Sequence, residues 1–334
     1  MARKKKNKSD SANKVLVIIA SLLSIIAVGL SSLIAWHYFV HDDVDEKVLK
    51  QEKIIKEKKS IDLNKSKTII SQKPLPVLTS GLKEVLENQE KDTTLASHEY
   101  DDIKLEKPPI MVKREIKLSS VKPKLAIIID DVSVKSHVRA IKALELPLTM
   151  SFLPPSSARP NSAKLASKEE FYMVHLPMEA QNFNKEEPFT LKVADTKKVI
   201  FKRITALKEL FPNVKYINNH TGSKFTSDEI AMNRLISVLN DKQINFIDSR
   251  TTAQTKAPKV LKNFGLKYVA RDVFLDHHND KEYILNQIKK AIKLAKLHGT
   301  AIAIGHPHSN TLLALGESKK LFKDIELVYI DRLR

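Results

Sequence analysis

The chain from Pro123 to Arg334 consists of short apolar runs that alternate with segments of helical periodicity. Near-continuous apolar runs of this length are typical of strands that helices cover on both faces, which is the arrangement of a parallel sheet. The pattern therefore predicts a barrel-like or strongly wound α/β domain of about seven parallel strands. The runs are KLAIIID, LPLTMSFL, FYMVHL, VKYINN, INFIDS, LKYVARDVFL and GTAIAIG, and the clearest helical segments lie at 134–145, 227–241 and 280–299.

Polar residues follow these runs at the points where the predicted strands end. In a parallel α/β fold the carboxyl ends of the strands meet at one edge, where catalytic loops gather. Four of the eight histidines between residues 123 and 334 occupy such positions, so we expect a metal or catalytic site there. The residues are Asp130, Asp131, His175, Asn218, Asn219, His220, Asp248, Ser249, His306 and His308.

The residue types favour metal-assisted hydrolysis. The sequence has no cysteine, so any metal must bind through histidine, aspartate or glutamate. A catalytic zinc site uses three such ligands and leaves one position for an acidified water, while hydrolysis of an amide or ester also needs a base and an acid. Asp130 and Asp131 could divide the ligand and base roles. His306 and His308 could supply a ligand and an acid.

Six strings in this region resemble one known family. They are KLAIIIDD, HLPME, INNHTGSKFT, FIDSRT, VFLD and IGHPH, they occur in this order, and they closely resemble the divergent polysaccharide deacetylases, a branch of the metal-dependent carbohydrate-ester and N-acetyl hydrolases. The resemblance implies a distorted (β/α) barrel and a divalent metal, with zinc expected. It also implies that Asp130 is the general base, that Asp131 is a metal ligand and that His306 or His308 is the general acid.

Two features of the better-known deacetylases are absent from residues 123–334. This segment has no H-x-x-x-H string, so the resemblance places the other ligands on separate strands, at His175 and His220 beside Asp131. There is no matching arginine-proline motif, which leaves Arg271 as the candidate for orienting Asp130. The residues expected to bind substrate or support the site are Asn218, Asn219, Gly222, Ser223, Asp248, Ser249, Arg250 and Arg271.

The other histidines have simpler interpretations. His277 and His278 follow the VFLD string in a polar turn, where a solvated loop is expected. His137 and His298 fall in helical segments, where packing or capping is expected.

The N-terminal third predicts a membrane anchor followed by a spacer. Residues 1–14 are basic, and Val15–Trp36 is a run of 22 uncharged residues, which is long enough to span the hydrocarbon core of a bilayer. The basic side stays in the cytoplasm, so we expect a single-pass anchor at 15–38 in the inner membrane and an exported domain at 123–334. Residues 41–122 are polar and interrupted by proline, which predicts a partly disordered stalk. A cleaved secretory signal is the alternative.

Charge indicates the kind of partner. The segment from Pro123 to Arg334 has 34 basic and 22 acidic residues, and this excess of positive charge suits an anionic envelope polymer. The sequence does not show the basic residues interleaved with aromatic ones that would favour binding to nucleic acid. We therefore expect an anchored enzyme that removes acetyl groups from an envelope glycan such as peptidoglycan. The alternatives are an inactive glycan-binding or partner-binding protein with the same fold, and a glycosidase, which would need two carboxylates flanking the scissile bond.

Overall fold

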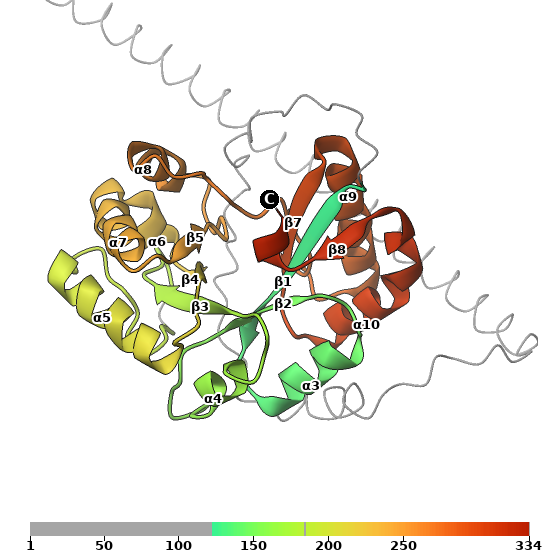
Figure 1. Cartoon of the computed structure of the whole chain (residues 1–334), viewed down its shortest axis with the longest axis horizontal. Coiled ribbons are helices and arrows are strands. Elements are labelled where there is room, and N and C mark those ends of the chain that lie inside the picture. The colour runs from blue at the N-terminus through green and yellow to red at the C-terminus, as the bar shows by residue number, and fades with distance from the viewer. Residues whose placement is uncertain (1–121, 184, 334) are drawn as a thin grey trace, which may run out of the picture. The chain divides into compact units, whose positions relative to one another are not determined.

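The computed structural model describes residues 122–183 and 185–333, in which one parallel sheet is covered by helices (Figure 1). The predicted tail at 1–14, anchor at 15–38 and stalk at 41–122 lie outside these residues, apart from Lys122. Among the residues described, no helix combines the length and the apolar character that crossing a membrane requires. The strands are β1 (Lys124–Val132), β2 (Thr149–Phe152), β3 (Met173–Met178), β4 (Tyr216–Thr221), β5 (Asn245–Ile247), β6 (Val273–Phe274), β7 (Thr300–Gly305) and β8 (Glu326–Val328).

The strands form a curled sheet in the order β5-β4-β3-β2-β1-β7-β6. The eighth strand, β8, pairs with the first three residues of β1, whereas β2 pairs with its second half. The prediction of about seven parallel strands is confirmed, and β8 is an addition that the sequence pattern did not indicate. The sheet is an open half-barrel, because its edge strands β5 and β6 are joined only by an isolated bridge between Asp248 and Ala270.

The sixth predicted strand, residues 266–275, is divided between the two edges of the sheet. Val269 and Arg271 exchange main-chain hydrogen bonds with Asp248 at the end of β5. Only Val273–Phe274 pairs with β7. The segment therefore passes from one edge of the open sheet to the other without forming a regular ladder, and the long strand predicted at 266–275 is reduced to the two residues of β6.

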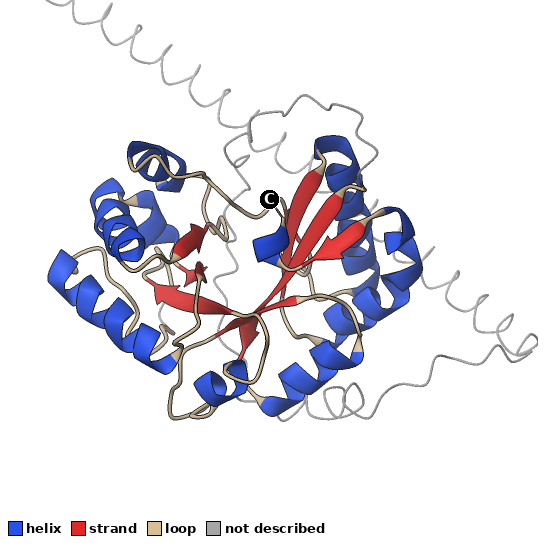
Figure 2. Cartoon of the chain, in the orientation of Figure 1, coloured by secondary structure: helices blue, strands red, loops and turns tan. Residues whose placement is uncertain are grey.

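Helices lie on the outer side of the curl (Figure 2). The predicted helices at 134–145, 227–241 and 280–299 are confirmed as α3, α7 and α9, and the side chains of Asp228 and Asp280 cap the last two. Gly299 ends α9 in a left-handed conformation. The helices are α3 (Lys135–Ala143), α4 (Ser162–Ala166), α5 (Lys197–Leu210), α6 (Ser223–Ser227), α7 (Glu229–Asp241), α8 (Ala257–Asn263), α9 (Lys281–His298) and α10 (Ser309–Glu317), with 3-10 helices η1 (Ser318–Asp324) and η2 (Ile330–Arg332).

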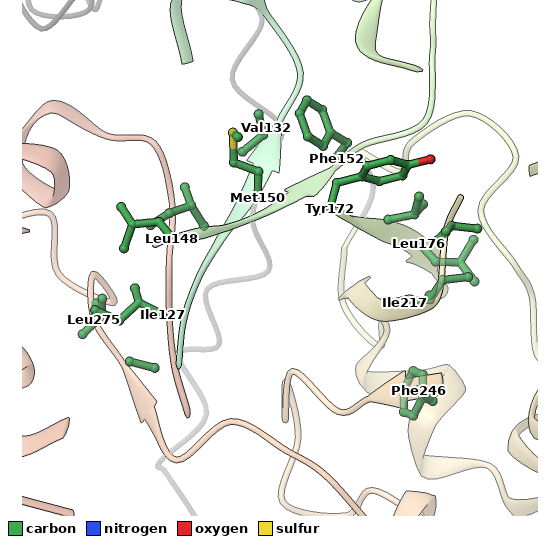
Figure 3. Packing of buried hydrophobic residues seen from close by; sticks show 14 of the residues in the cluster. Ile127, Val132, Leu148, Met150, Phe152, Tyr172, Leu176, Ile217, Phe246 and Leu275 are labelled. Carbon is green, nitrogen blue, oxygen red and sulfur yellow. The ribbon is translucent and has the colours of Figure 1, made fainter. Parts of the chain in front are cut away.

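Alternate residues of each strand face two different cores. Ile127 and Leu176 belong to the large core between the sheet and the helices, shown in part in Figure 3. Ala126, Ile128 and Ile304 belong to a small second core inside the curl. Since side chains alternate along a strand, this second set marks the inward-facing positions.

The amino ends of the strands are closed by the C-terminal segment. Ile330 of η2 packs into the second core, and its main-chain N–H donates to Thr149 Oγ1 at 3.1 Å. Phe171, just before β3, contacts the rings of Tyr216 and Tyr329. The inside of the curl is therefore filled and capped at this end, which leaves the carboxyl ends of the strands for a site.

Candidate active site

Strand alternation carries the predicted site residues to the inner face of the sheet. On β1 the inward positions Ala126 and Ile128 are followed by Asp130, and on β7 Ile304 is followed by His306. The same step of two leads from Met173 to His175 on β3, from Tyr216 to Asn218 and His220 on β4, and from Ile247, the last residue of β5, to Ser249. The apolar core inside the curl thus ends in a buried layer of carboxylates, imidazoles and amides.

A local distortion turns both carboxylates of the Asp-Asp pair toward this layer. Alternation alone would place Asp131 on the opposite face from Asp130. Asp131 instead has a positive φ of 56°, and the register of β1 with β2 shifts between Ile129 and Val132. As a result, His175 Nε2 lies 3.6 Å from Asp130 Oδ2 and 3.5 Å from Asp131 Oδ1.

Asp131, His175 and His220 form the first candidate metal group. His220 Nδ1 lies 3.1 Å from Asp131 Oδ1, and the three residues are buried. One donor atom from each lies within 4.8 Å of the others. One carboxylate and two imidazoles form a donor set that zinc accepts, so the predicted ligands fit a divalent metal.

Asn218 fixes both the first metal group and Asp130. Its side-chain N–H donates to both oxygens of Asp130 at 2.9 Å, and its Oδ1 accepts from Ser151 Oγ at 2.6 Å. Because Oδ1 is an acceptor, His175 Nδ1, which lies 3.1 Å away, is the protonated nitrogen. His175 Nε2 is then the atom that can bind a metal, as the resemblance requires.

Burial raises the pKa of Asp130 to about 7, although the charge of His306 and the Asn218 hydrogen bond act in the opposite direction. A carboxylate with this pKa can take up and return a proton near neutral pH. Arg271, the candidate for orienting Asp130, donates to the main-chain carbonyls of Ser249 and Arg250 at 2.6 and 2.8 Å. Within residues 122–183 and 185–333, the side chain that donates to Asp130 is Asn218.

Asp276, His306 and His308 form a second buried group in the segments that follow β6 and β7. Asp276 Oδ1 lies 3.0 Å from His306 Nδ1, and Asp276 Oδ2 accepts from the main-chain N–H of His306 at 2.6 Å and from Thr311 Oγ1 at 2.7 Å. The His308 ring lies 5.6 Å from the His306 ring. Asp276 was not among the predicted site residues, although the VFLD string contains it and it follows a predicted strand.

Asp276 controls the protonation of His306. Burial disfavours the imidazolium, but the charge of Asp276 and its hydrogen bond outweigh burial and raise the pKa of His306 to about 9. The pKa of Asp276 is correspondingly low, because His306 outweighs the effect of burial on the carboxyl group. Burial lowers the pKa of His308, and the nearby His306 lowers it further. At neutral pH the pair therefore presents a protonated His306 beside a neutral His308.

Arg250 and Arg271 brace the rim between the ends of β5 and β6. Arg250 Nη1 donates to the carbonyl of Arg271 at 3.1 Å, and Arg271 Nη2 donates to the carbonyl of Arg250. The Arg271 guanidinium also lies 4.6 Å from the centre of the Phe274 ring. Arg250 has a positive φ of 53°, which the bond from its N–H to Asp248 Oδ1 holds.

Four other predicted residues support the loops of the site. Asn219 Oδ1 accepts from the N–H of Ser249, and Ser223 Oγ accepts from the N–H of Gln181, both at 2.9 Å. Asp248 Oδ2 accepts from Thr255 and Tyr268. Gly222 has a φ of 95°, and a Cβ there would lie 2.9 Å from Met178 Cβ, so only glycine fits without a shift.

The remaining histidines belong to neither group. His278 is exposed and His277 is half-buried, and their rings contact each other. His137 is buried in α3, and His298 is in the last turn of α9. These places agree with the expected loop, packing and capping positions.

The fold and the site define a parallel α/β protein with a candidate metal-dependent hydrolase centre at the carboxyl rim of its sheet. The model of the family "Divergent polysaccharide deacetylase" matches residues 127–334, which is more than half of the chain, and the chain belongs to this family.

The chain is also similar to two other proteins and to one solved structure. It is 33% identical over 220 residues to an uncharacterized protein of Haemophilus influenzae, covering 64% of this chain and 78% of that one. It is 34% identical over 208 residues to the uncharacterized protein YibQ of Escherichia coli, covering 61% of this chain and 65% of that one, slightly less than two thirds. The crystal structure of the uncharacterized protein ATU2773 from Agrobacterium tumefaciens has the same fold, with a TM-score of 0.56 and 19% identity over 66% of this chain and 93% of that one.

Proposed function

We propose that this protein is a metal-dependent hydrolase that removes acetyl groups from an envelope polysaccharide, with zinc as the metal. The observation that carries the proposal is that the candidate metal group lies together with two residues that can transfer protons, Asp130 and His306, and that their surroundings give these residues different pKa values. Asp130 borders Asp131 and His175, and His306, which follows β7, is held by Asp276, which follows the neighbouring strand β6. Two titratable groups whose environments separate their pKa values are typical of an acid and a base.

Each role follows from the environment of the residue. Asp131, His175 and His220 would hold the ion, which when bound would acidify a water and polarise the acyl carbonyl. Asp130, held at both oxygens by Asn218, takes the proton of the attacking water. His306, kept protonated by Asp276, gives a proton to the leaving amine or hydroxyl of the sugar.

The substrate class is supported by family membership and by charge. The family description names polysaccharide deacetylases. The excess of basic residues in Pro123–Arg334 suits an anionic glycan of the envelope, and Arg250, on the rim beside Ser249, is our candidate for a substrate contact.

The decisive experiment compares Asp130→Asn with the parent protein, both loaded with zinc and tested on acetylated peptidoglycan fragments. We expect acetate release to fall by about 10²–10⁴, because this is the usual contribution of general base catalysis. The metal content and the circular dichroism spectrum should stay unchanged. Asp324→Asn, which alters an exposed carboxylate paired with Lys296, is the matched control.

Either of two results would contradict the proposal. Equal rates in Asp130→Asn and the parent would remove Asp130 from the mechanism. Absence of acetate release by the parent, on peptidoglycan and on other acetylated envelope glycans, would favour the alternative of an inactive binding protein.

We also propose that the domain is exported and tethered to the inner membrane. The support is the sequence, in which basic residues precede the uncharged run Val15–Trp36 and acidic residues follow it. Protease added to spheroplasts should digest the segment from Pro123 to Arg334 or release it from the membrane. Its protection until the spheroplasts are lysed would contradict this topology.

A further inference from the structure

The second buried group, Asp276, His306 and His308, has the same composition as the first. It contains one carboxylate and two imidazoles, and one donor atom from each residue lies within 4.8 Å of the others. Their exposed fractions are 0, 5 and 7%, so all three are shielded from solvent. Nitrogen and oxygen donors at such separations suit zinc and other divalent ions of the first transition series rather than magnesium, which prefers oxygen.

The carboxylate of this group is held firmly in place. Asp276 Oδ2 accepts from the N–H of His306 and from Thr311 Oγ1, so its position is set by β7 and α10. Gly305 lets these elements approach, since a Cβ there would lie 3.3 Å from Asp276 Oδ2. In metal sites the carboxylate ligands are commonly held in position by hydrogen bonds of this kind.

We propose that Asp276, His306 and His308 form a second divalent-metal site that binds zinc more weakly than Asp131, His175 and His220. An ion between Asp276 Oδ1 and His306 Nδ1 takes the place of the hydrogen shared across their 3.0 Å contact. Binding there therefore displaces a shared proton and breaks the contact between the two side chains. In the first group a similar contact joins His220 Nδ1 to Asp131 Oδ1 at 3.1 Å, but Asp131 Oδ1 also lies near His175 Nε2, and Asn218 directs the His175 proton away from that ligand nitrogen.

Occupation of the second site has a consequence that rests on the proposed function. If His306 is the proton donor, an ion in its place removes the acid, and acetate release falls as zinc fills the weaker site. Free zinc in excess of the tight site would then inhibit an enzyme that also requires zinc. Binding itself is independent of this consequence and can be measured without a substrate.

The experiment is a zinc titration of the tag-free full-length protein in detergent, with a chromophoric chelator as competitor. For the parent we expect two classes of site, one ion in each per chain. Asp131→Ala should lose the tight class and keep the weak one. His308→Ala and His308→Gln should weaken the second class at least tenfold and keep the first.

His278→Ala is the matched control, because it removes an exposed histidine from the loop between β6 and α9 and leaves the buried group intact. Two classes retained in His278→Ala would support the site. A single class in the parent would overturn it, as would loss of the weak class in His278→Ala but not in the folded His308 variants. Two classes with acetate release unaffected by the second ion would keep the metal site and remove His306 as the acid.

Discussion

The two buried groups at the carboxyl rim contain the same residue types but differ in what holds their carboxylates. In the first, Asp131 Oδ1 lies near nitrogens of both His175 and His220. In the second, Asp276 binds one imidazole, a main-chain N–H and a threonine hydroxyl. The first arrangement is suited to a shared metal ion, and the second is suited to keeping a proton on an imidazole. Composition alone therefore does not assign a role to an Asp-His-His set.

The largest expected difference between the two groups is in tight metal binding. Asp131→Ala should weaken the tightest zinc site by more than about 100-fold, the upper range for loss of an outer-shell partner, because a direct ligand is removed. Asp276→Ala should keep that site and lose activity. Elemental analysis after dialysis against a weak chelator measures the first effect. If both variants retained tight zinc equally, the ligand assignment would have to be abandoned.

A smaller difference should appear in the dependence of the rate on pH. The pKa of His306 is raised to about 9 from an ordinary value of 6.5, so the stabilisation from its pairing with Asp276 is complete below about pH 6.5 and is lost as the pH rises through about 9. At low free zinc, kcat/KM of the parent should fall with a basic limb near pH 9. In Asp276→Asn this limb should move down by at least one pH unit, because the neutral amide no longer stabilises the imidazolium.

The control for this shift is Asp272→Asn, which alters a carboxylate on the same segment that is bonded to the N–H of Ile302. Its basic limb should stay near that of the parent. An unchanged limb in Asp276→Asn would mean that another group supplies the proton.

The smallest expected difference is in the free energy of unfolding, when the glycine beside each group is replaced by alanine. These glycines are Gly222 for the first group and Gly305 for the second. Gly222→Ala should lower the free energy of unfolding by about 2–4 kcal/mol, because it combines a positive φ with a 2.9 Å contact to Met178. Gly305→Ala should cost about 1–2 kcal/mol, because its contacts begin at 3.2 Å and its φ is not in the left-handed region. Urea unfolding measures both. The reverse order would show that the β7 side of the rim is the more tightly packed.

Much of the fold could be predicted from the sequence because local patterns determine it. The continuous apolar run at Ile127–Ile129 and the periodic segment of α9 each identify their element without any distant partner. Two-residue alternation then places Asp130 and His175 on one face, and the rule that parallel strands end at one rim brings them together.

Tertiary structure decided what these residues contact. Nothing local indicates that residues 266–275 divide between two sheet edges, because that depends on how far the sheet curls. Asp276 was missed for a similar reason, since its partners His306 and Thr311 lie 30 and 35 residues further along the chain. Asn218 was among the predicted site residues, but its hydrogen bond to Asp130, 88 residues away, could not be predicted for the same reason.

The sequence by itself determined the parallel α/β class, the rim and the set of polar residues that reach it, since these follow from periods of two and 3.6 residues. Only the tertiary structure decided which carboxylate faces two imidazoles and which accepts from backbone and hydroxyl. Hydrogen-bond partners across a sheet are fixed by register, curl and burial, and those properties depend on the whole chain packing at once.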